Sequence, residues 1–235
     1  MTVQVYTGLP GSGKSYHGVR EALWWSRTRL VVANFAVTDA PPVEVVNGRA
    51  RGWMYLKDED LTLEKLLGVY EVYLKSQHRE SCALLCMDEA QRMFNTREWN
   101  RGDRKSWVTF FSLHRHLGFD CVLVCQDLAI LDGQVKAMCA EEVRHRRVNR
   151  HFPFKFWPRP VFATVTFQMH TRLKGQLGLL FFKPKVAGRY DSLHEFDMGK
   201  LAALVGVAGT SAGARAERGP RGGGLVGRVP GRVAS

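Results

Sequence analysis

The chain alternates between short segments that are mostly apolar and longer segments in which apolar residues recur every three or four positions. The first pattern is typical of buried strands, and the second is typical of amphipathic helices. Strands are predicted at Thr2–Thr7, Leu30–Phe35, Leu84–Met87 and Cys121–Cys125, and helices after residue 15 and over 63–74, 107–117 and 131–138. This alternation predicts an α/β protein with a doubly wound, mostly parallel sheet.

Two regions depart from that alternation. Residues 37–58 carry prolines and glycines and predict an irregular segment. After about residue 150, the runs Phe152–Phe156, Val161–Met169 and Leu177–Phe182 are aromatic and β-branched, with a turn at Lys174-Gly175, and predict an antiparallel β extension. We therefore expect a core at 1–150, a β-rich extension packed on it at 151–198, and a Gly-, Ala- and Arg-rich tail at 199–235 that is disordered.

Residues 8–15 fit the phosphate-binding loop pattern G-x-x-x-x-G-K-[ST] at every fixed position. Glycines let successive backbone N–H groups turn toward phosphate oxygens, and the predicted strand before the loop and helix after it supply the expected context. Lys14 can reach the β- and γ-phosphates, and the Ser15 hydroxyl can ligate Mg²⁺. The sequence thus predicts ATP and Mg²⁺ as cofactors, bound by Gly8, Pro10, Gly11, Ser12, Gly13, Lys14, Ser15 and Tyr16.

Polar side chains follow the last two of the four predicted apolar strands. Asp88 and Glu89 end the run Leu84–Met87, where Asp88 is expected to hold the metal with Ser15 and Glu89 to polarise the attacking water. Gln126 follows Cys121–Cys125, and a polar residue there senses the γ-phosphate or orients the water in additional-strand NTPases. The alternatives are a solvated acidic turn and a polar residue that merely terminates a strand.

Charge and cysteine content narrow the class of protein. The 235 residues carry a formal net charge of +12 with a pI near 9.8, which suggests polyanionic partners such as nucleic acid or anionic lipid. Five cysteines, an odd number lying mostly in apolar runs, indicate a reducing compartment rather than a disulfide framework. We find no signal peptide and no apolar run near the ~20 residues that a membrane span needs.

The motifs resemble those of the zonular occludens toxin (Zot) family, the assembly NTPases of filamentous bacteriophages. The matching residues are Gly8–Tyr16, Met87–Phe94 and His114–Asp127, with weaker echoes at Arg144–Arg147 and Tyr190–Leu193, so that the resemblance covers about residues 1–195. It implies an oligomeric ATPase at the cytoplasmic face of the host inner membrane that drives extrusion of single-stranded DNA. Its implied partners are single-stranded phage DNA or its protein complex, the host inner membrane and envelope-spanning assembly proteins. Such proteins usually carry a membrane span after the NTPase domain, which this sequence lacks.

Arginines supply two further hypotheses. Motor NTPases often receive an arginine from a neighbouring subunit, and Arg97 is the first candidate here, followed by Arg92 and Arg115. The run Arg144–Arg147, beside a cluster of aromatic residues, could track a DNA backbone. In the competing interpretation, the aromatics form a β-core and the arginines its solvated face.

Three functions are compatible with these features. The first is an ATP-hydrolysing assembly motor, and the alternative is a non-hydrolysing, nucleotide-bound adaptor that docks phage and secretion components. An adaptor has no need of a water-polarising Glu89. A small kinase is disfavoured, because no Arg-rich lid follows the third strand.

Overall fold

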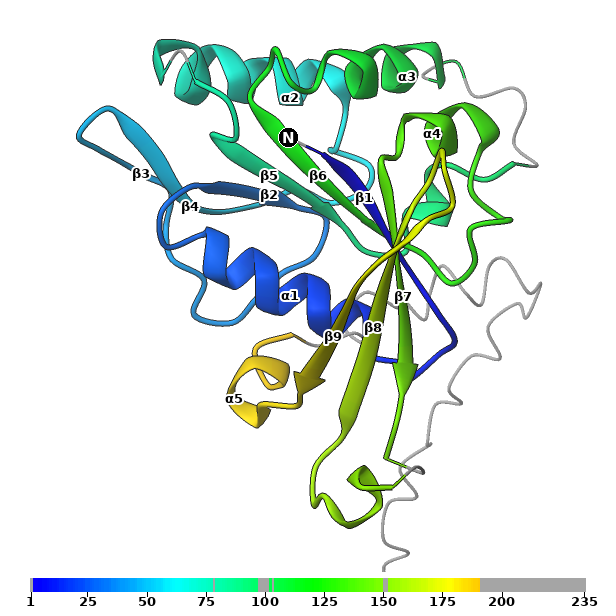
Figure 1. The fold of residues 1–235 in the computed structure, drawn as a ribbon. Helices are drawn as coiled ribbons and strands as arrows, with labels where there is room; N and C mark the ends of the chain where they lie inside the picture. The colour runs from blue at the N-terminus through cyan, green and yellow to red at the C-terminus, as the bar shows by residue number, and fades with distance from the viewer. Residues whose placement is uncertain (1, 78, 97–101, 103, 150–151, 191–235) are drawn as a thin grey trace, which may run out of the picture. The chain divides into compact units, whose positions relative to one another are not determined.

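A mixed sheet organises the part of the chain that the computed structural model describes, which is residues 2–190 without 78, 97–101, 103 and 150–151. Its strands lie in the order β3-β4-β2-β5-β6-β1-β7-β8-β9 (Figure 1). Their bounds are β1 Val3–Thr7, β2 Leu30–Ala33, β3 Glu44–Val46, β4 Arg49–Tyr55, β5 Ala83–Met87, β6 Phe119–Val124, β7 Glu141–Arg147, β8 Val161–Gln168 and β9 Lys174–Phe181. The strands from β4 through β7 in this order run parallel, whereas β3, β8 and β9 are antiparallel to their neighbours.

The order of three central strands defines the class of the sheet. Strand β6 lies between β1, which leads into the phosphate-binding loop, and β5, which ends at the acidic pair. This inserted strand is the feature for which additional-strand NTPases are named. The predicted α/β P-loop NTPase fold with a C-terminal antiparallel extension is therefore confirmed. Because the strands are parallel, the loops that follow β1, β5 and β6 meet at one edge of the sheet.

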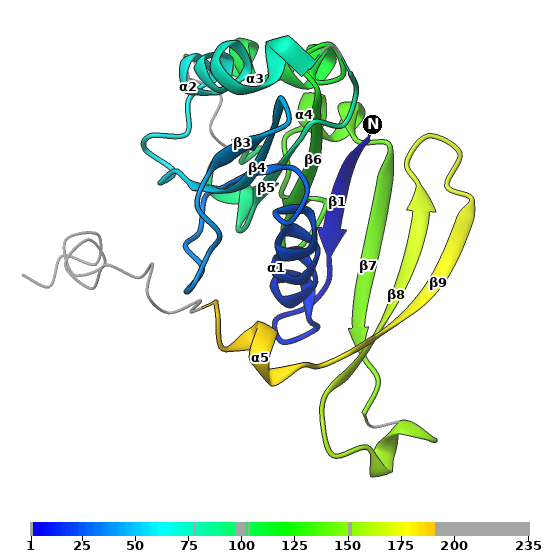
Figure 2. The ribbon, with the colours of Figure 1, turned by 90° about the vertical axis from the view of Figure 1, so that its left-hand side faces the viewer.

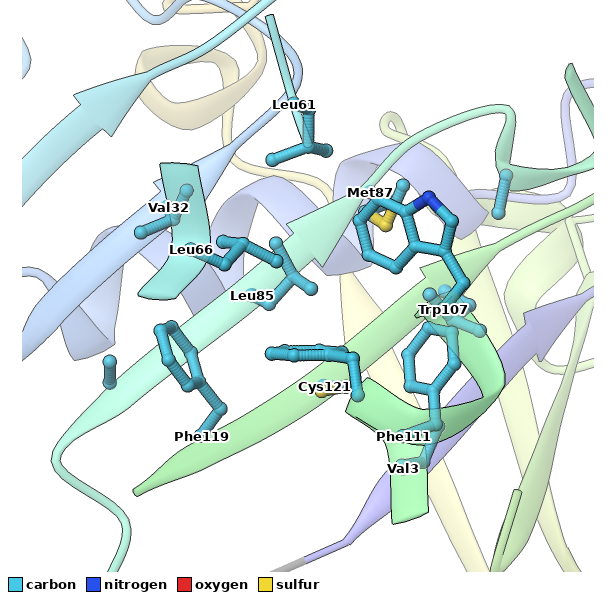
Figure 3. Packing of buried hydrophobic residues seen from close by; sticks show 14 of the residues in the cluster. Val3, Val32, Leu61, Leu66, Leu85, Met87, Trp107, Phe111, Phe119 and Cys121 are labelled. Carbon is cyan, nitrogen blue, oxygen red and sulfur yellow. The ribbon is translucent and has the colours of Figure 1, made fainter. Parts of the chain in front are cut away.

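Helices cover both faces of the parallel strands, with α1 on one side and α2 and α3 on the other (Figure 1). The bounds are α1 Lys14–Trp25, α2 Leu63–Val69 continued by a π-helical turn Tyr70–Leu74, α3 Arg104–Leu113, α4 Gly133–Met138 and α5 Pro184–Ala187, with 3-10 turns at Lys75–Gln77, Ala90–Arg92 and Phe154–Phe156. Figure 3 shows Leu85 and Cys121 of the sheet in one cluster with Phe111 and Trp107 of α3. Every residue of β5 is buried, which explains its uninterrupted apolar run.

The expectation of an irregular segment over 37–58 is wrong, because this segment contains the β3–β4 hairpin. Asn47 and Gly48 form its turn and have φ angles of 51° and 71°, the combination that tight hairpin turns favour. Strand β4 then pairs in parallel with β2. Its sequence mixes arginines with Ala50, Gly52 and Trp53, so it lacks the apolar run by which β1, β2, β5 and β6 were found.

Two details of the β extension are also wrong. Phe154–Phe156 forms a 3-10 turn, and the strand lies upstream at Glu141–Arg147. Lys174 and Gly175 begin β9 rather than forming a turn. Strand β7 was missed because it is charged, yet it buries Glu142 and His145, which have hydrogen-bond partners. The described residues beyond 151 continue the same sheet, and the domain division at 150 and 198 stays a prediction.

Candidate nucleotide-binding site

The loop between β1 and α1 has the backbone conformation that phosphate binding requires. Gly8, Gly11 and Gly13 all have positive φ angles, at 142°, 73° and 93°. A Cβ atom at Gly8 would lie 2.5 Å from the His145 carbonyl oxygen, and one at Gly13 would lie 2.6 Å from the Phe162 ring. Both positions therefore exclude any side chain, and the curled backbone ends at the N-terminus of α1, where anions are favoured.

Polar groups of the loop also fit an anionic ligand. The Ser12 hydroxyl oxygen is buried and has no hydrogen-bond partner among the described residues, an arrangement that costs free energy unless a ligand supplies one. Lys14 is buried at the start of α1, and its Nζ lies 3.4 Å from the Leu9 carbonyl oxygen across the loop. A pocket of about 270 Å³ lies beside these residues, lined by Gly11, Gly13, Lys14, Ser15, Tyr16, Val19, Phe162, Ala187 and Tyr190.

The two residues predicted to hold the metal lie side by side. Ser15 Oγ donates a hydrogen bond to Asp88 Oδ1 at 3.2 Å, although 73 residues separate them in sequence. Mg²⁺ takes oxygen ligands at about 2.0–2.1 Å in octahedral geometry, so adjacent ligands lie about 2.9 Å apart. The observed separation is close to that value, and a hydroxyl and a carboxylate are suitable donors. Ser15 and Asp88 therefore fit Mg²⁺.

A residue that the sequence analysis did not assign to the site fixes the backbone of Asp88. Asn34, just after β2, accepts from the Asp88 amide at 2.7 Å and donates to the Asp88 carbonyl at 2.8 Å. Its Nδ2 also donates to Asp58 at 2.7 Å, and Asp58 pairs with Arg92. The signal in the sequence that could have indicated Asn34 is its place as a polar residue at the end of an apolar strand. Its two hydrogen bonds to Asp88 connect the end of β2 to the end of β5.

The two predicted water-handling residues lie at the same edge of the sheet. Glu89 has φ 49° and ψ 42°, an uncommon left-handed conformation for a residue with a side chain, and its carboxylate accepts from the Gln91 amide. Gln126, two residues after β6, accepts the Gly8 N–H through its carbonyl at 3.3 Å, while its side chain is exposed. The roles of Glu89 in water activation and of Gln126 in γ-phosphate sensing stay predictions.

The segment after β9 lies over the loop and contacts the acidic strand. The Tyr190 hydroxyl donates to Asp88 Oδ2 at 2.6 Å, and its ring packs against Phe35 at 5.1 Å. Tyr16, which was predicted to bind the nucleotide, donates to the Phe181 carbonyl at 3.0 Å and accepts from the Lys183 amide at 2.9 Å. The role of Tyr190 at the site was missed, because nothing in its local sequence indicates a contact 102 residues away.

The arginine candidates are placed differently. Arg97, the first candidate for a residue acting in trans, lies outside the described residues. Arg92 pairs with Asp58 at 2.5 Å near the site. Arg115 pairs with Glu80 at 3.6 Å and lies just before β6, at the sheet edge opposite the phosphate-binding loop. Which arginine acts in trans stays a hypothesis.

The run that was predicted to contact DNA lies on β7. Arg144 hydrogen-bonds to Glu142 at 2.9 and 3.0 Å and stacks over the Phe167 ring, while Arg146 and Arg147 are exposed. The interpretation of the neighbouring aromatics as a β-core is wrong for Phe152, Phe156 and Trp157, which are 84%, 79% and 51% exposed. A contact of these arginines with DNA stays a prediction.

Behind the loop, two buried histidines form a neutral pair. His145 Nδ1 faces the carbonyl oxygens of Thr7 and Val143 at 3.2 and 3.0 Å, so this nitrogen carries the proton. His145 Nε2 then accepts from His17 Nδ1 at 2.8 Å. Burial lowers the pKa of His17 to about 3 and that of His145 to about 4. Protonation of His145 at Nε2 would place two N–H groups against each other.

This pair predicts a loss of stability in mild acid. Unfolded histidines bind protons near pH 6.5, whereas in the folded protein His145 stays neutral down to about pH 4 and His17 down to about pH 3. The free energy of unfolding therefore falls as the pH is lowered from about 6.5 toward these values. Each histidine contributes up to about 1.4 kcal/mol per pH unit there. Urea denaturation at about pH 7.5 and about pH 5 measures the difference.

The matched variants are His17→Asn and His116→Asn, the latter at an exposed histidine. His17→Asn should reduce the difference between the two pH values, and His116→Asn should leave it unchanged. Burial raises the pKa of Glu21, which acts in the opposite sense but is common to all three proteins. Equal pH dependence in the His17→Asn variant and the parent would contradict the prediction.

None of the helices within the described residues combines the length and apolar character needed to cross a membrane. The fold is similar to that of the N-terminal domain of zonular occludens toxin from Neisseria meningitidis, with a TM-score of 0.50 and 16% identity over 81% of this chain and 98% of that one.

Two curated relatives are named Gene 1 protein. The protein of Enterobacteria phage fd is 41% identical over 68 residues, which is 28% of this chain and 20% of that protein. The protein of Enterobacteria phage I2-2 is 29% identical over 154 residues, which is 64% of this chain and 41% of that protein. The chain thus matches less than half the length of these relatives. The family model for zonular occludens toxin (Zot) matches residues 2–168, and the chain therefore belongs to the Zot family.

Proposed function

We propose that this chain is the ATP-hydrolysing part of a motor that assembles filamentous phage and extrudes its single-stranded DNA through the bacterial envelope. The observation that carries the proposal is the contact of Ser15 with Asp88 at 3.2 Å beside a loop of three positive-φ glycines. A serine hydroxyl, a buried carboxylate and Lys14 gathered at a helix N-terminus are the groups that bind a nucleoside triphosphate with its metal.

Each residue has a defined role in this proposal. The loop amides and Lys14 bind the phosphates, and Ser15 and Asp88 hold Mg²⁺, which when bound neutralises charge on the phosphate oxygens. Glu89 accepts a proton from the attacking water, and Gln126 orients that water or detects the γ-phosphate. Asn34 keeps Asp88 in place through its two hydrogen bonds to the Asp88 backbone.

The wider setting of the motor rests on the family. We propose that it acts as a homo-oligomer at the cytoplasmic face of the host inner membrane. Its proposed partners are single-stranded phage DNA or its protein complex and the envelope-spanning assembly proteins of the phage. Membership of the Zot family and the similarity to phage Gene 1 proteins support this setting.

One observation favours the alternative of a non-hydrolysing adaptor. Asp88 accepts a hydrogen bond from Tyr190, and Glu89 accepts one from Gln91, so both acidic side chains already have protein partners. An adaptor could keep these contacts while nucleotide is bound. A motor must release at least the Glu89 carboxylate to water, and hydrolysis therefore separates the two functions.

The test is phosphate release from ATP by the purified protein, with Mg²⁺ or with a chelator, and with or without a single-stranded oligonucleotide. We expect turnover that requires Mg²⁺ and rises when the oligonucleotide is added. Nucleotide binding without turnover, at protein concentrations that allow assembly and in the presence of the oligonucleotide, would favour the adaptor instead.

A further inference from the structure

A large cleft lies between α1 and the β8–β9 hairpin, separate from the pocket at the phosphate-binding loop. Its volume is about 1110 Å³, above the range of about 300–1,000 Å³ typical of small-molecule pockets. Figure 2 shows α1 on one side of β7 and the two strands of the hairpin on the other, with α5 below. An open cleft of this size suits a chain-like ligand better than a single metabolite.

Basic side chains outnumber acidic ones along the walls of the cleft. Its lining includes five basic side chains, Arg20, Arg27, Lys183, Lys185 and Arg189, against two carboxylates, Glu21 and Asp39. Within the described part of the chain, no carboxylate forms an ion pair with Arg20, Arg27, Lys183 or Lys185. Glu21 accepts a hydrogen bond from the Tyr6 hydroxyl. The cleft therefore has an excess of positive charge available to a polyanion.

An exposed aromatic side chain lies among these cations. Trp24 lines the cleft and is 65% exposed, although a tryptophan this accessible is uncommon in a soluble protein. Arg20, Trp24 and Arg27 follow one another at intervals of four and three residues, which places them on one face along α1 and its C-terminal end. Cations on both sides of an exposed ring are the arrangement that binds phosphates and stacks a base.

We propose that this cleft binds a single-stranded polynucleotide, with its phosphates on the basic side chains and a base stacked on Trp24. The opposite wall, on the hairpin, offers Thr166 and Gln176, which are neutral and can hydrogen-bond to bases without adding repulsion. A single strand is favoured over a duplex, because bases inside a duplex are stacked on each other and unavailable to Trp24.

The cleft shares structural elements with the nucleotide site. Helix α1 begins at Lys14 and carries Trp24 near its other end, while α5 contributes Val186 to the cleft and Ala187 to the pocket at the loop. This inference deepens the proposed motor function and takes its biological meaning from it. Binding is nevertheless measured without ATP turnover, so a failure of the cleft and a failure of hydrolysis are distinguishable.

The test measures binding of a fluorescent oligothymidylate by anisotropy at several salt concentrations, with no nucleotide present. Trp24→Ala should weaken binding about 5- to 100-fold through the loss of stacking, and Trp24→Phe should restore most of it. The double variant Arg20→Gln, Arg27→Gln should weaken binding and reduce the salt slope by about 1.4, because each lost phosphate contact removes about 0.7. The side chains of Trp24 and Arg27 are exposed. The melting temperatures of these variants should therefore differ little from that of the parent.

The double variant Arg49→Gln, Arg79→Gln is the matched control, since it removes the same charge from exposed positions outside the cleft and outside the Arg144–Arg147 run. The proposal expects this control to bind like the parent. Equal losses in both double variants, or unchanged binding in Trp24→Ala, would overturn it. So would binding to phosphatidylserine-containing vesicles that depends on Arg20 and Arg27 while oligothymidylate binding does not, because the cleft would then be a membrane contact.

Discussion

Lys14→Ala is expected to abolish ATP turnover, with a fall of at least about 10²–10³-fold, the loss that accompanies removal of a single charge-stabilising donor from a catalytic site. Lys14 supplies the full positive charge of the loop, and its amine lies across the loop from the Leu9 carbonyl at 3.4 Å. That hydrogen bond is long, so the amine contributes little to folding and is available to phosphate. Steady-state phosphate release measures turnover, and titration with a fluorescent ATP analogue measures nucleotide binding.

Lys65→Ala is the matched control, because Lys65 is an exposed lysine on α2, on the opposite face of the sheet from α1. It should leave turnover and nucleotide binding unchanged. Thermal melting of both variants should resemble that of the parent. A folded Lys14→Ala protein that hydrolyses ATP at a near-normal rate would remove the basis for assigning phosphate binding to this loop.

The parts of the site that could be predicted are those encoded by residues close together in sequence. The loop from Gly8 to Ser15 needs glycines, a lysine and a serine at fixed spacing, because the backbone itself forms the cradle. Asp88 and Gln126 could be placed beside it, because parallel strands bring their carboxyl ends to one edge. The contact of Ser15 with Asp88 follows directly from that rule.

The parts that could not be predicted depend on contacts between distant segments. Tyr190 reaches Asp88 only because the chain after β9 crosses back over α1, and nothing in its neighbours indicates that path. Strand β7 was missed because Glu142 and His145 are buried with specific partners, which an apolar pattern does not reveal. The cleft beside Trp24 is formed by α1, α5 and the hairpin together, so its charge is invisible along the chain.

The largest remaining effects concern the two adjacent acids, which should fail in different ways. Glu89→Gln should reduce hydrolysis about 10²–10⁴-fold, because the amide keeps the size of the side chain but cannot accept a proton from water. Its oxygen can still accept from the Gln91 amide, so the local left-handed turn should persist. Binding of the ATP analogue in the presence of Mg²⁺ should therefore remain close to that of the parent.

Asp88→Asn should instead weaken the nucleotide binding that depends on the metal. It removes the negative charge of the carboxylate that contacts Ser15 and is proposed to hold Mg²⁺. The diagnostic quantity is the ratio of analogue affinities with Mg²⁺ and with a chelator. This ratio should be kept in Glu89→Gln, should collapse toward one in Asp88→Asn, and should be unchanged in Asp127→Asn, which removes an exposed acid after β6. If Asp88→Asn and Glu89→Gln gave the same ratio and the same turnover, the acids would share one role, and the division between a metal ligand and a proton acceptor would be wrong.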